Sequence, residues 1–176
     1  MGERTARPDR RAACGLPQAG QGVTAPAWQA GLAKLGLELP PVAPPVAVYV
    51  PAVRTGSLVY TSGQLPFVGG ALPRTGKVGA DLDTAEAAEL AKLCALNALA
   101  AVHDLVGLDS VVRVVKVVGF VASAPGYTDQ PLVVNGASEF LGAVLGDAGV
   151  HARSAVGVSE LPKNSPVEVE IIAEVR

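Results

Sequence analysis

The sequence predicts an α+β domain in which strands precede, separate and follow two long helices. Three observations lead to this class: short β-branched and aromatic runs within residues 46–66, two later segments with helical spacing of apolar residues, and a strand-like run after each helix. The predicted order of elements is β-β-(β)-α-β-α-β-β. One domain is expected, because 176 residues that are 49% apolar and 17% charged suit a single sizeable core.

The N-terminal segment differs from the rest of the chain. Residues 1–27 hold four arginines and several Gly and Pro without apolar periodicity, which predicts a disordered tail. The pair Arg10-Arg11 is not followed by an apolar run adequate for an export signal. Residues 28–39 then predict a short amphipathic helix that Pro40 and the following proline stop, so the domain is expected to span 28–176.

Two short strands and a turn come next. The stretch VAVYVPAVRTGSLVYTSGQLP, residues 46–66, has two β-branched and aromatic runs around Thr55-Gly56, which indicates a hairpin. Residues 69–79, GGALPRTGKVG, are typical of a loop or of a further short hairpin.

A first long helix is predicted to begin after Asp83. Asp83 is suited to cap this helix, Glu86 three residues later can reach back, and Gly107 can close the far end. One apolar face is expected from residues at helical spacing: Leu90, Leu93, Leu96, Ala100 and Leu105.

The second half alternates strand and helix. Residues 111–121, VVRVVKVVGFV, predict a strand by their β-branched content, and residues 131–146 predict the second helix. The strand is apolar on both faces except for Arg113 and Lys116, yet two helices can cover only one face of a sheet. Partner subunits are therefore expected to cover the other face. The alternative, that the helix at 28–39 folds over it, is weaker because that segment is short and flanked by proline.

The last predicted strand separates apolar from acidic residues. Positions two apart share a face, so Glu168, Glu170 and Glu174 point away from the apolar face. That apolar face comprises Val167, Val169, Ile171, Ala173 and Val175. One interpretation is an exposed edge strand whose carboxylates serve solubility.

Arg153 provides the other interpretation. It lies on the preceding strand and, in an antiparallel pair, would be close enough to the acidic residues to share a pocket. Its guanidinium can hold Glu168 in a buried pair or bind the carboxylate of a small ligand. The residues alone leave both possibilities open.

Several other classes of function are disfavoured by composition. A net charge of −2 gives no basic surface for nucleic acid. Cys14 and Cys94 form no CxxC motif, so neither a disulfide framework nor a zinc site is expected, and a reducing cytoplasm is the simpler expectation. No uninterrupted apolar span is long enough to cross a bilayer. His103 or His151 with a serine such as Ser62 does not make a hydrolase, because GxSxG is missing.

Three segments carry a family resemblance: LVYTSGQLP at 58–66, VVNGASEF at 133–140, and RSAVGVSELPKNSPVEVEIIAEV at 153–175. They resemble the signature segments of the RidA family, also called YjgF or Rid, of imine deaminases. The resemblance covers roughly residues 42–176. It implies a chorismate-mutase-like sheet with two helices packed on one face, assembled as a homotrimer with ligand sites in the clefts between subunits.

The resemblance also implies roles for individual residues. Arg153 matches the family's substrate-carboxylate arginine, and Glu168 matches its water-activating glutamate. Positions that line or adjoin the cleft match Tyr49, Ser62, Gly63, Asn135, Leu161, Pro162 and Lys163. The implied reaction is hydrolysis of enamines and imines such as 2-aminoacrylate to 2-keto acids and ammonia. It requires no metal and no cofactor.

Departures from the family pattern indicate a divergent branch. Val50-Pro51 follows Tyr49 where close members have Ser-Gln, and Gly157 replaces a frequent acidic residue. Two alternatives to the enzyme therefore stay open: a non-catalytic trimeric module that binds small carboxylates or protein partners, and, more weakly, an endoribonuclease. The natural substrate, and whether it belongs to general metabolite repair or to one pathway, are left open by the sequence.

Overall fold

The computed structural model describes residues 27–42 and 48–176. The tail predicted at 1–27 lies outside the described residues except for its last position. The helices are α1 (Ala27–Lys34), α2 (Thr84–Val106) and α3 (Gln130–Leu145). The strands are β1 (Ala52–Thr55), β2 (Leu58–Thr61), β3 (Val111–Ala122), β4 (Ala152–Val158) and β5 (Val167–Val175). These elements confirm the predicted α+β class and the hairpin at Thr55-Gly56.

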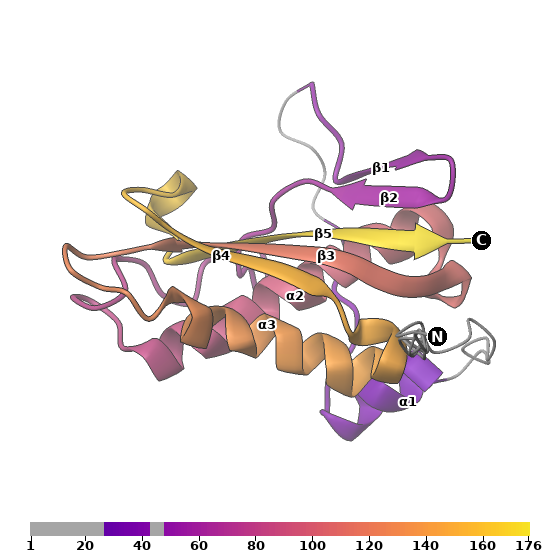
Figure 1. The fold of residues 1–176 in the computed structure, drawn as a ribbon, viewed down its shortest axis with the longest axis horizontal. Coiled ribbons are helices and arrows are strands. Elements are labelled where there is room, and N and C mark those ends of the chain that lie inside the picture. Colours follow the sequence, from indigo (N-terminus) through magenta and orange to yellow (C-terminus); the bar gives the residue numbers. More distant parts are fainter. Residues whose placement is uncertain (1–26, 43–47) are drawn as a thin grey trace, which may run out of the picture.

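The five strands form one mixed sheet in the order β1-β2-β5-β3-β4. The β3–β4 pair is parallel because α3 carries the chain back between them, and the other neighbours are antiparallel (Figure 1). Strand β5 therefore lies in the middle of the sheet. The interpretation of β5 as an edge strand is wrong, since it pairs with β2 on one side and β3 on the other.

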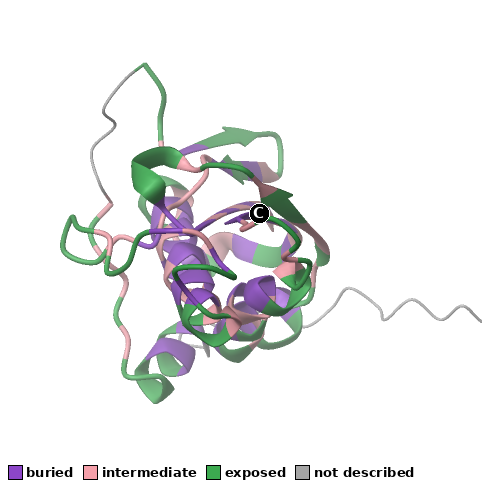
Figure 2. Cartoon of the chain, turned by 90° about the vertical axis from the view of Figure 1, so that its left-hand side faces the viewer, coloured by how far each residue is buried: buried purple, intermediate pink, exposed green. Residues whose placement is uncertain are grey.

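The core lies between the sheet and its helices (Figure 2). Strand β5 alternates buried and half-buried residues along its whole length, as the sequence predicts. Gly119 of β3 lets the sheet approach α3 closely, because a Cβ there would collide with the methyl groups of Val134. Gly136 has the same effect between the helices, where a Cβ would meet the backbone of Ala88. The close approach excludes water from the apolar layer.

Helix α2 begins as predicted and buries most of the predicted stripe: Leu90, Leu96 and Ala100 are buried, and Leu93 is half-buried. Asp83 accepts a hydrogen bond from the backbone N–H of Glu86, and the Glu86 side chain accepts one from the Asp83 N–H, so the capping box is complete. Leu105, expected on the apolar face, is 44% exposed. The sheet and α3 both pack against α2, and small side chains on α2 allow both to approach closely. The small buried residues of α2 are Ala87, Ala91, Cys94, Ala95, Ala98 and Ala101.

Helix α1 ends earlier than the predicted position 39. Gly36 has a φ of 66°, and the backbone N–H of Leu37 donates to the carbonyl of Leu32, which closes the helix in a Schellman turn. Gly31 lies directly against the backbone of Val144 in α3. Helix α1 therefore joins the helical layer, and the alternative that it covers the second face of the sheet is wrong (Figure 1).

Residues 69–79 form a loop with isolated bridges rather than a further hairpin of regular strands. The backbone N–H of Val68 donates to the carbonyl of Ala71, and Val78 pairs with both Leu82 and Ser123. These contacts connect the loop to the end of β3.

Among the helices in the described part of the chain, none combines the length and apolar character needed to span a bilayer.

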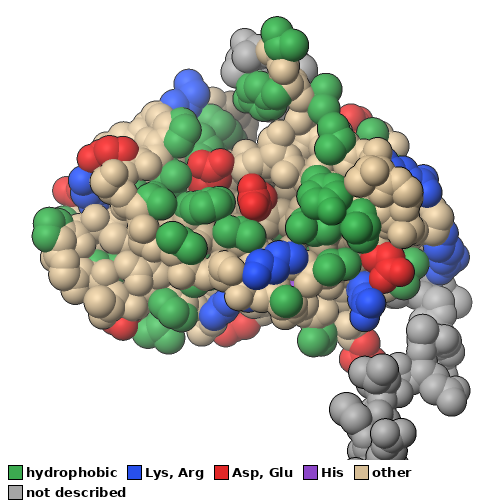
Figure 3. Space-filling view, turned by 45° about the horizontal axis from the view of Figure 1, so that its top comes forward, with side chains coloured by type: hydrophobic (Ala, Val, Ile, Leu, Met, Phe, Trp, Pro, Cys, Tyr) green, Lys and Arg blue, Asp and Glu red, His purple; other side chains and the backbone are tan. Residues whose placement is uncertain are grey.

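The face of the sheet opposite the helices is mixed in character. Tyr60 is 38% exposed and Val156 is 42% exposed, whereas Phe120 between them in the sheet is half-buried. Charged groups share the face, including an ion pair of 3.0 Å between Arg113 Nε and Glu174 Oε2. Figure 3 shows hydrophobic side chains interspersed with a few acidic and basic ones on the side that is turned forward. We call the face of the sheet opposite the helices the open face.

Candidate functional site

The two residues predicted to carry the chemistry do not meet within one chain. Strand β3 separates β4 from β5, with Val117 paired to Arg153 and Phe120 paired to Glu168. Val117 is fully buried under the helices, whereas Phe120 faces the opposite side. Arg153 and Glu168 therefore lie on opposite faces of the sheet. The expected antiparallel pairing of their strands, and with it an ion pair inside one subunit, is wrong because the α3 crossover places β4 beyond β3.

Arg153 is held by α3. Its Nη1 atom donates to Asn135 Oδ1 at 2.8 Å and to Ser138 Oγ at 3.1 Å. The two acceptors are three residues apart and so lie on the same side of the helix. No ion pair forms between Arg153 and any carboxylate of residues 27–42 and 48–176. The guanidinium is thus oriented through Nη1, and its Nε–Nη2 edge makes no hydrogen bond within that part of the chain.

We call Arg153, Asn135 and Ser138 the arginine cluster. Asn135 was predicted to line the site, and the structure places it directly against Arg153. Ser138 was missed by the sequence reasoning. The available signal was its position one helical turn after Asn135, on the face that meets β4.

Glu168 lies away from the arginine cluster, beside the segment that follows β2. The backbone of Gln64 exchanges two hydrogen bonds with Val169, of 2.8 and 3.0 Å, which extends the β2–β5 pairing past the end of β2. Gly63 therefore lies against Glu168 so closely that a Cβ at 63 would collide with the carboxylate. This contact, and not the backbone angles of Gly63, favours glycine at position 63, because a Cβ there would force the Glu168 carboxylate to move.

Ser62 and Tyr49 belong to the same region. The Ser62 side chain donates to the carbonyl of Val50 at 2.7 Å, and its backbone N–H donates to Pro51 at 2.8 Å. These bonds hold the segment that carries Tyr49, which is 52% exposed. We call Glu168, Gly63, Ser62 and Tyr49 the glutamate cluster.

Burial raises the pKa of the Glu168 carboxyl above its ordinary value, and the nearby charge of Glu170 raises it further. Glu168 makes no hydrogen bond and no ion pair with the other residues that the structure describes. Cys94, buried beneath it, has a thiol pKa raised mainly by burial and also by the charge of Glu168. A half-buried carboxylate without a cationic partner is a frequent property of functional sites.

The loop before β5 adjoins the glutamate cluster in sequence. Residues Pro162–Asn164 form a short 3₁₀ turn in which Lys163 has a φ of 58° and is exposed. The carbonyl of Asn164 accepts from the backbone N–H of Gly76 at 2.9 Å. Leu161, which precedes the turn, is half-buried. The structure thus places Pro162 and Lys163 six and five residues before Glu168, without a hydrogen bond to its side chain.

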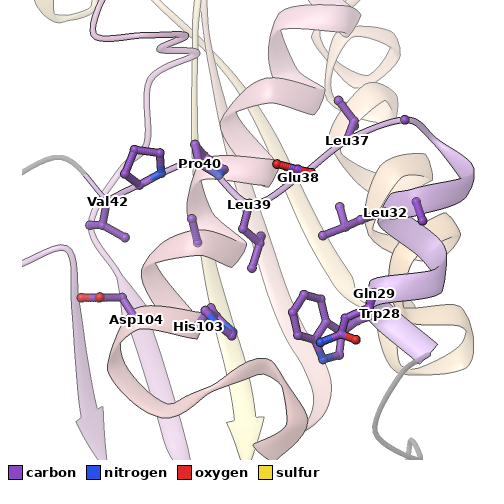
Figure 4. A pocket seen from close by; sticks show the side chains of 14 residues that line it. Trp28, Gln29, Leu32, Leu37, Glu38, Leu39, Pro40, Val42, His103 and Asp104 are labelled. Atoms are coloured by element: carbon purple, nitrogen blue, oxygen red, sulfur yellow. The ribbon is translucent and has the colours of Figure 1, made fainter.

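A pocket lies away from both clusters. It has a volume of about 1220 Å³ and lies between α1, the chain after it and the end of α2, and no predicted site residue lines it (Figure 4). Trp28 and His103 meet there with ring centroids 5.3 Å apart. Within 27–42 and 48–176 no group of three acidic, His or Cys side chains is suited to a metal ion.

The fold is of the chorismate-mutase-like α+β class, because the sheet has this strand order and its helices lie on one face. The site consists of two separate charged clusters, one around an arginine on the edge strand and one around a glutamate on the middle strand. The family described as "YjgF/chorismate_mutase-like, putative endoribonuclease" matches residues 29–175. The chain therefore belongs to the YjgF, or RidA, family.

Individual family members differ in how similar they are to this chain. Protein TCP17 of Trypanosoma cruzi is 43% identical over 149 residues, which cover 82% of this chain and 92% of TCP17. A crystal structure of a protein of unknown function from Agrobacterium tumefaciens is 45% identical, with a TM-score of 0.81 over 85% of this chain and 93% of that one. Escherichia coli TdcF with bound serine is 28% identical, with a TM-score of 0.55 over 78% and 94%. The lower similarity to TdcF fits the predicted divergent branch.

Proposed function

We propose that this protein hydrolyses small imine or enamine acids, of the 2-aminoacrylate kind, to 2-keto acids and ammonia. The observation that carries the proposal is the pair of clusters. Among the residues that the structure describes, the oriented Arg153 has no carboxylate partner and the half-buried Glu168 has no cationic partner. The free guanidinium can bind the carboxylate of a ligand, and the free glutamate can act as a base on the same ligand.

The proposed site forms between subunits of a homotrimer. Because Arg153 and Glu168 lie on opposite faces of one sheet, a single chain does not present them to the same small ligand. When one subunit packs its open face against the β4 edge of the next, the arginine cluster of one can meet the glutamate cluster of the other. The exposed apolar residues of the open face, such as Val156 and Tyr60, supply the area to bury.

Each cluster has one task in the reaction. The Nε–Nη2 edge of Arg153 binds the substrate carboxylate with two parallel hydrogen bonds. Glu168 orients a water molecule and accepts one of its protons as the oxygen attacks the imine carbon. Glu168 then gives this proton to the nitrogen of the tetrahedral amino alcohol. The C–N bond breaks as the carbonyl forms, and the hydroxyl proton leaves with the nitrogen, so that the 2-keto acid and ammonium are released. The protonated imine is itself electrophilic, which lowers the demand on the protein.

Two further observations support a small carboxylate as ligand. Asn135 accepts from Arg153 through Oδ1, so its amide N–H groups remain available to a ligand. The TdcF structure, a relative, holds serine, which is a small amino acid with a carboxylate. The size and charge of the proposed substrate match such a ligand.

The direct test generates imines in the assay with an amino-acid oxidase and follows keto-acid and ammonia release. The protein is expected to accelerate release well above the rate of spontaneous hydrolysis. Binding of a 2-keto acid without acceleration would instead favour the non-catalytic binding module. Cleavage of RNA without imine hydrolysis would favour the endoribonuclease in the family description, which a net charge of −2 does not support.

The assembly itself gives a prediction. Sedimentation equilibrium at micromolar protein is expected to give three times the chain mass of 17.8 kDa. Replacing Val156, which is exposed on the open face, with glutamate is expected to dissociate the trimer and abolish hydrolysis, because it would bury an unpaired charge. Val150→Glu is the control, since Val150 is 73% exposed and precedes β4. A stable monomer of the unmodified chain would remove the intersubunit site.

Gly63 offers a prediction at the glutamate cluster. Gly63→Ala is expected to keep the fold but lower hydrolysis about tenfold, because the added Cβ displaces the Glu168 carboxylate from its position. Gly142→Ala in α3 is the matched control, since its Cβ would meet open space and alanine favours helix. Both rates and melting temperatures are measured. Full activity in Gly63→Ala would show that the position of Glu168 is not critical.

A further inference from the structure

A chain of hydrogen bonds extends behind the arginine cluster. Ser138 Oγ, which accepts from Arg153 Nη1 at 3.1 Å, lies 3.0 Å from His151 Nε2. The other ring nitrogen of His151, Nδ1, is hydrogen-bonded to the carbonyl oxygen of Gly149. All three side chains are half-buried. They come from three separate places in the chain: the middle of α3, the residue before β4, and β4 itself.

The carbonyl of Gly149 determines which group donates and which accepts in each of these hydrogen bonds. A carbonyl oxygen only accepts, so Nδ1 of His151 must carry the proton. In the neutral ring Nε2 is then an acceptor, and the Ser138 hydroxyl donates to it. The lone pairs of Ser138 Oγ thereby face Arg153, which only donates. Each group has one consistent role, and Arg153 is at the donating end.

This arrangement fixes the guanidinium in one orientation. A serine hydroxyl on a helix otherwise rotates freely and can donate to the helix backbone instead of accepting from a neighbour. His151 removes this freedom because its Nε2 atom accepts a hydrogen bond from the hydroxyl. Ser138 and Asn135 together then hold both hydrogens of Nη1, so the Nε–Nη2 edge keeps a constant direction.

We propose that Ser138 and His151 are positioning residues that hold Arg153 ready for the substrate carboxylate. The proposal rests on the proposed function for the identity of the ligand, but it concerns binding of the carboxylate and not the hydrolytic step. His151 acts only through Ser138, because no hydrogen bond joins His151 to Arg153 among the described residues. Preorganised donors raise affinity by reducing the ordering cost of binding.

The test measures pyruvate binding by isothermal titration calorimetry together with the kinetics of imine hydrolysis, on the full chain in its native assembly. Ser138→Ala is expected to raise the Kd for pyruvate and KM about 3- to 10-fold, the range of one lost hydrogen bond, with kcat changed less than about twofold. His151→Ala is expected to raise Kd by a smaller factor. Ser138→Thr retains a hydroxyl and is expected to restore the wild-type Kd.

A double-mutant cycle separates positioning from general damage. If His151 acts through Ser138, the variant carrying both alanines should have the same Kd as Ser138→Ala alone. The matched control is Ser110→Ala, which removes a half-buried hydroxyl that donates to the carbonyl of Gly107 at 2.7 Å, outside the arginine cluster. It should leave Kd unchanged even if it lowers the melting temperature.

The ring nitrogen shifts of His151 in an NMR experiment provide a readout independent of ligand. In the neutral imidazole a protonated Nδ1 and an unprotonated Nε2 are expected, and the reverse tautomer would overturn the proposal. Wild-type Kd in Ser138→Ala, or additive effects of the two alanines, would also overturn it. Wild-type protein that binds pyruvate but does not hydrolyse imines would overturn the deaminase proposal alone, and the Kd comparison would still decide the roles of Ser138 and His151.

Discussion

Replacing Glu168 with glutamine is expected to lower kcat for imine hydrolysis by about 10²–10⁴-fold, the usual effect of losing an acid–base group. Glutamine preserves the shape of the side chain beside Gly63, so pyruvate should still bind. The carboxamide does not accept the proton of the attacking water. Steady-state kinetics and pyruvate titration on the same preparation check both expectations.

Stability distinguishes this catalytic role from a structural one. Within the chain, burial and Glu170 raise the pKa of Glu168, so the folded protein binds that proton more tightly than the unfolded protein does. Its contribution to stability is therefore present below the unfolded pKa and is lost as pH rises through the raised folded pKa. At neutral pH the charge is carried at a cost, and Glu168→Gln should melt at the same or a higher temperature. An unchanged hydrolysis rate with a lower melting temperature would reject the catalytic assignment.

Two neighbouring glutamates provide controls on the same face of β5. Glu174→Gln removes the partner of Arg113 but should leave kcat unchanged. Glu170→Gln removes a charge that raises the pKa of Glu168, so it should move the acidic limb of the pH–rate profile to lower pH while the maximal rate persists. An unshifted limb would mean that a group other than Glu168 controls that limb.

Arg153→Lys is expected to lower kcat/KM by about 10–10²-fold, because a charge-assisted hydrogen bond is worth about 1.5–3 kcal/mol and an ammonium does not offer the two-pronged edge. The lysine also loses the planar group that Asn135 and Ser138 orient. The fold should persist, since Arg153 is half-buried and lies on a strand at the edge of the sheet.

The control for this change is Arg113→Lys, which alters an exposed ion pair with Glu174 and should not affect hydrolysis. Comparing carboxylate and carboxamide forms of the same ligand sharpens the assignment. The wild type should prefer the carboxylate, and Arg153→Lys should lose most of that preference. Near-normal turnover in the lysine variant would instead assign Arg153 a structural role.

Local features of this fold follow from nearby residues and were predictable. The capping box at Asp83 and Glu86, the turn at Thr55-Gly56 and the alternation along β5 each depend on contacts within a few positions. The same holds for Asn135 and Ser138, which share one side of α3 because they are three residues apart. The resemblance added the roles of Arg153 and Glu168, which remain predictions.

The sequence by itself determined which residues alternate, cap and turn, and it determined that one domain of α+β class forms. Only the tertiary structure decided that β5 inserts between β2 and β3, and that Arg153 and Glu168 pair with residues of β3 that face opposite sides. It also decided that Ser138 and His151 meet behind Arg153. The physical reason is that strand order depends on how the whole apolar layer is buried, and such long-range packing leaves no periodic signal in any one segment.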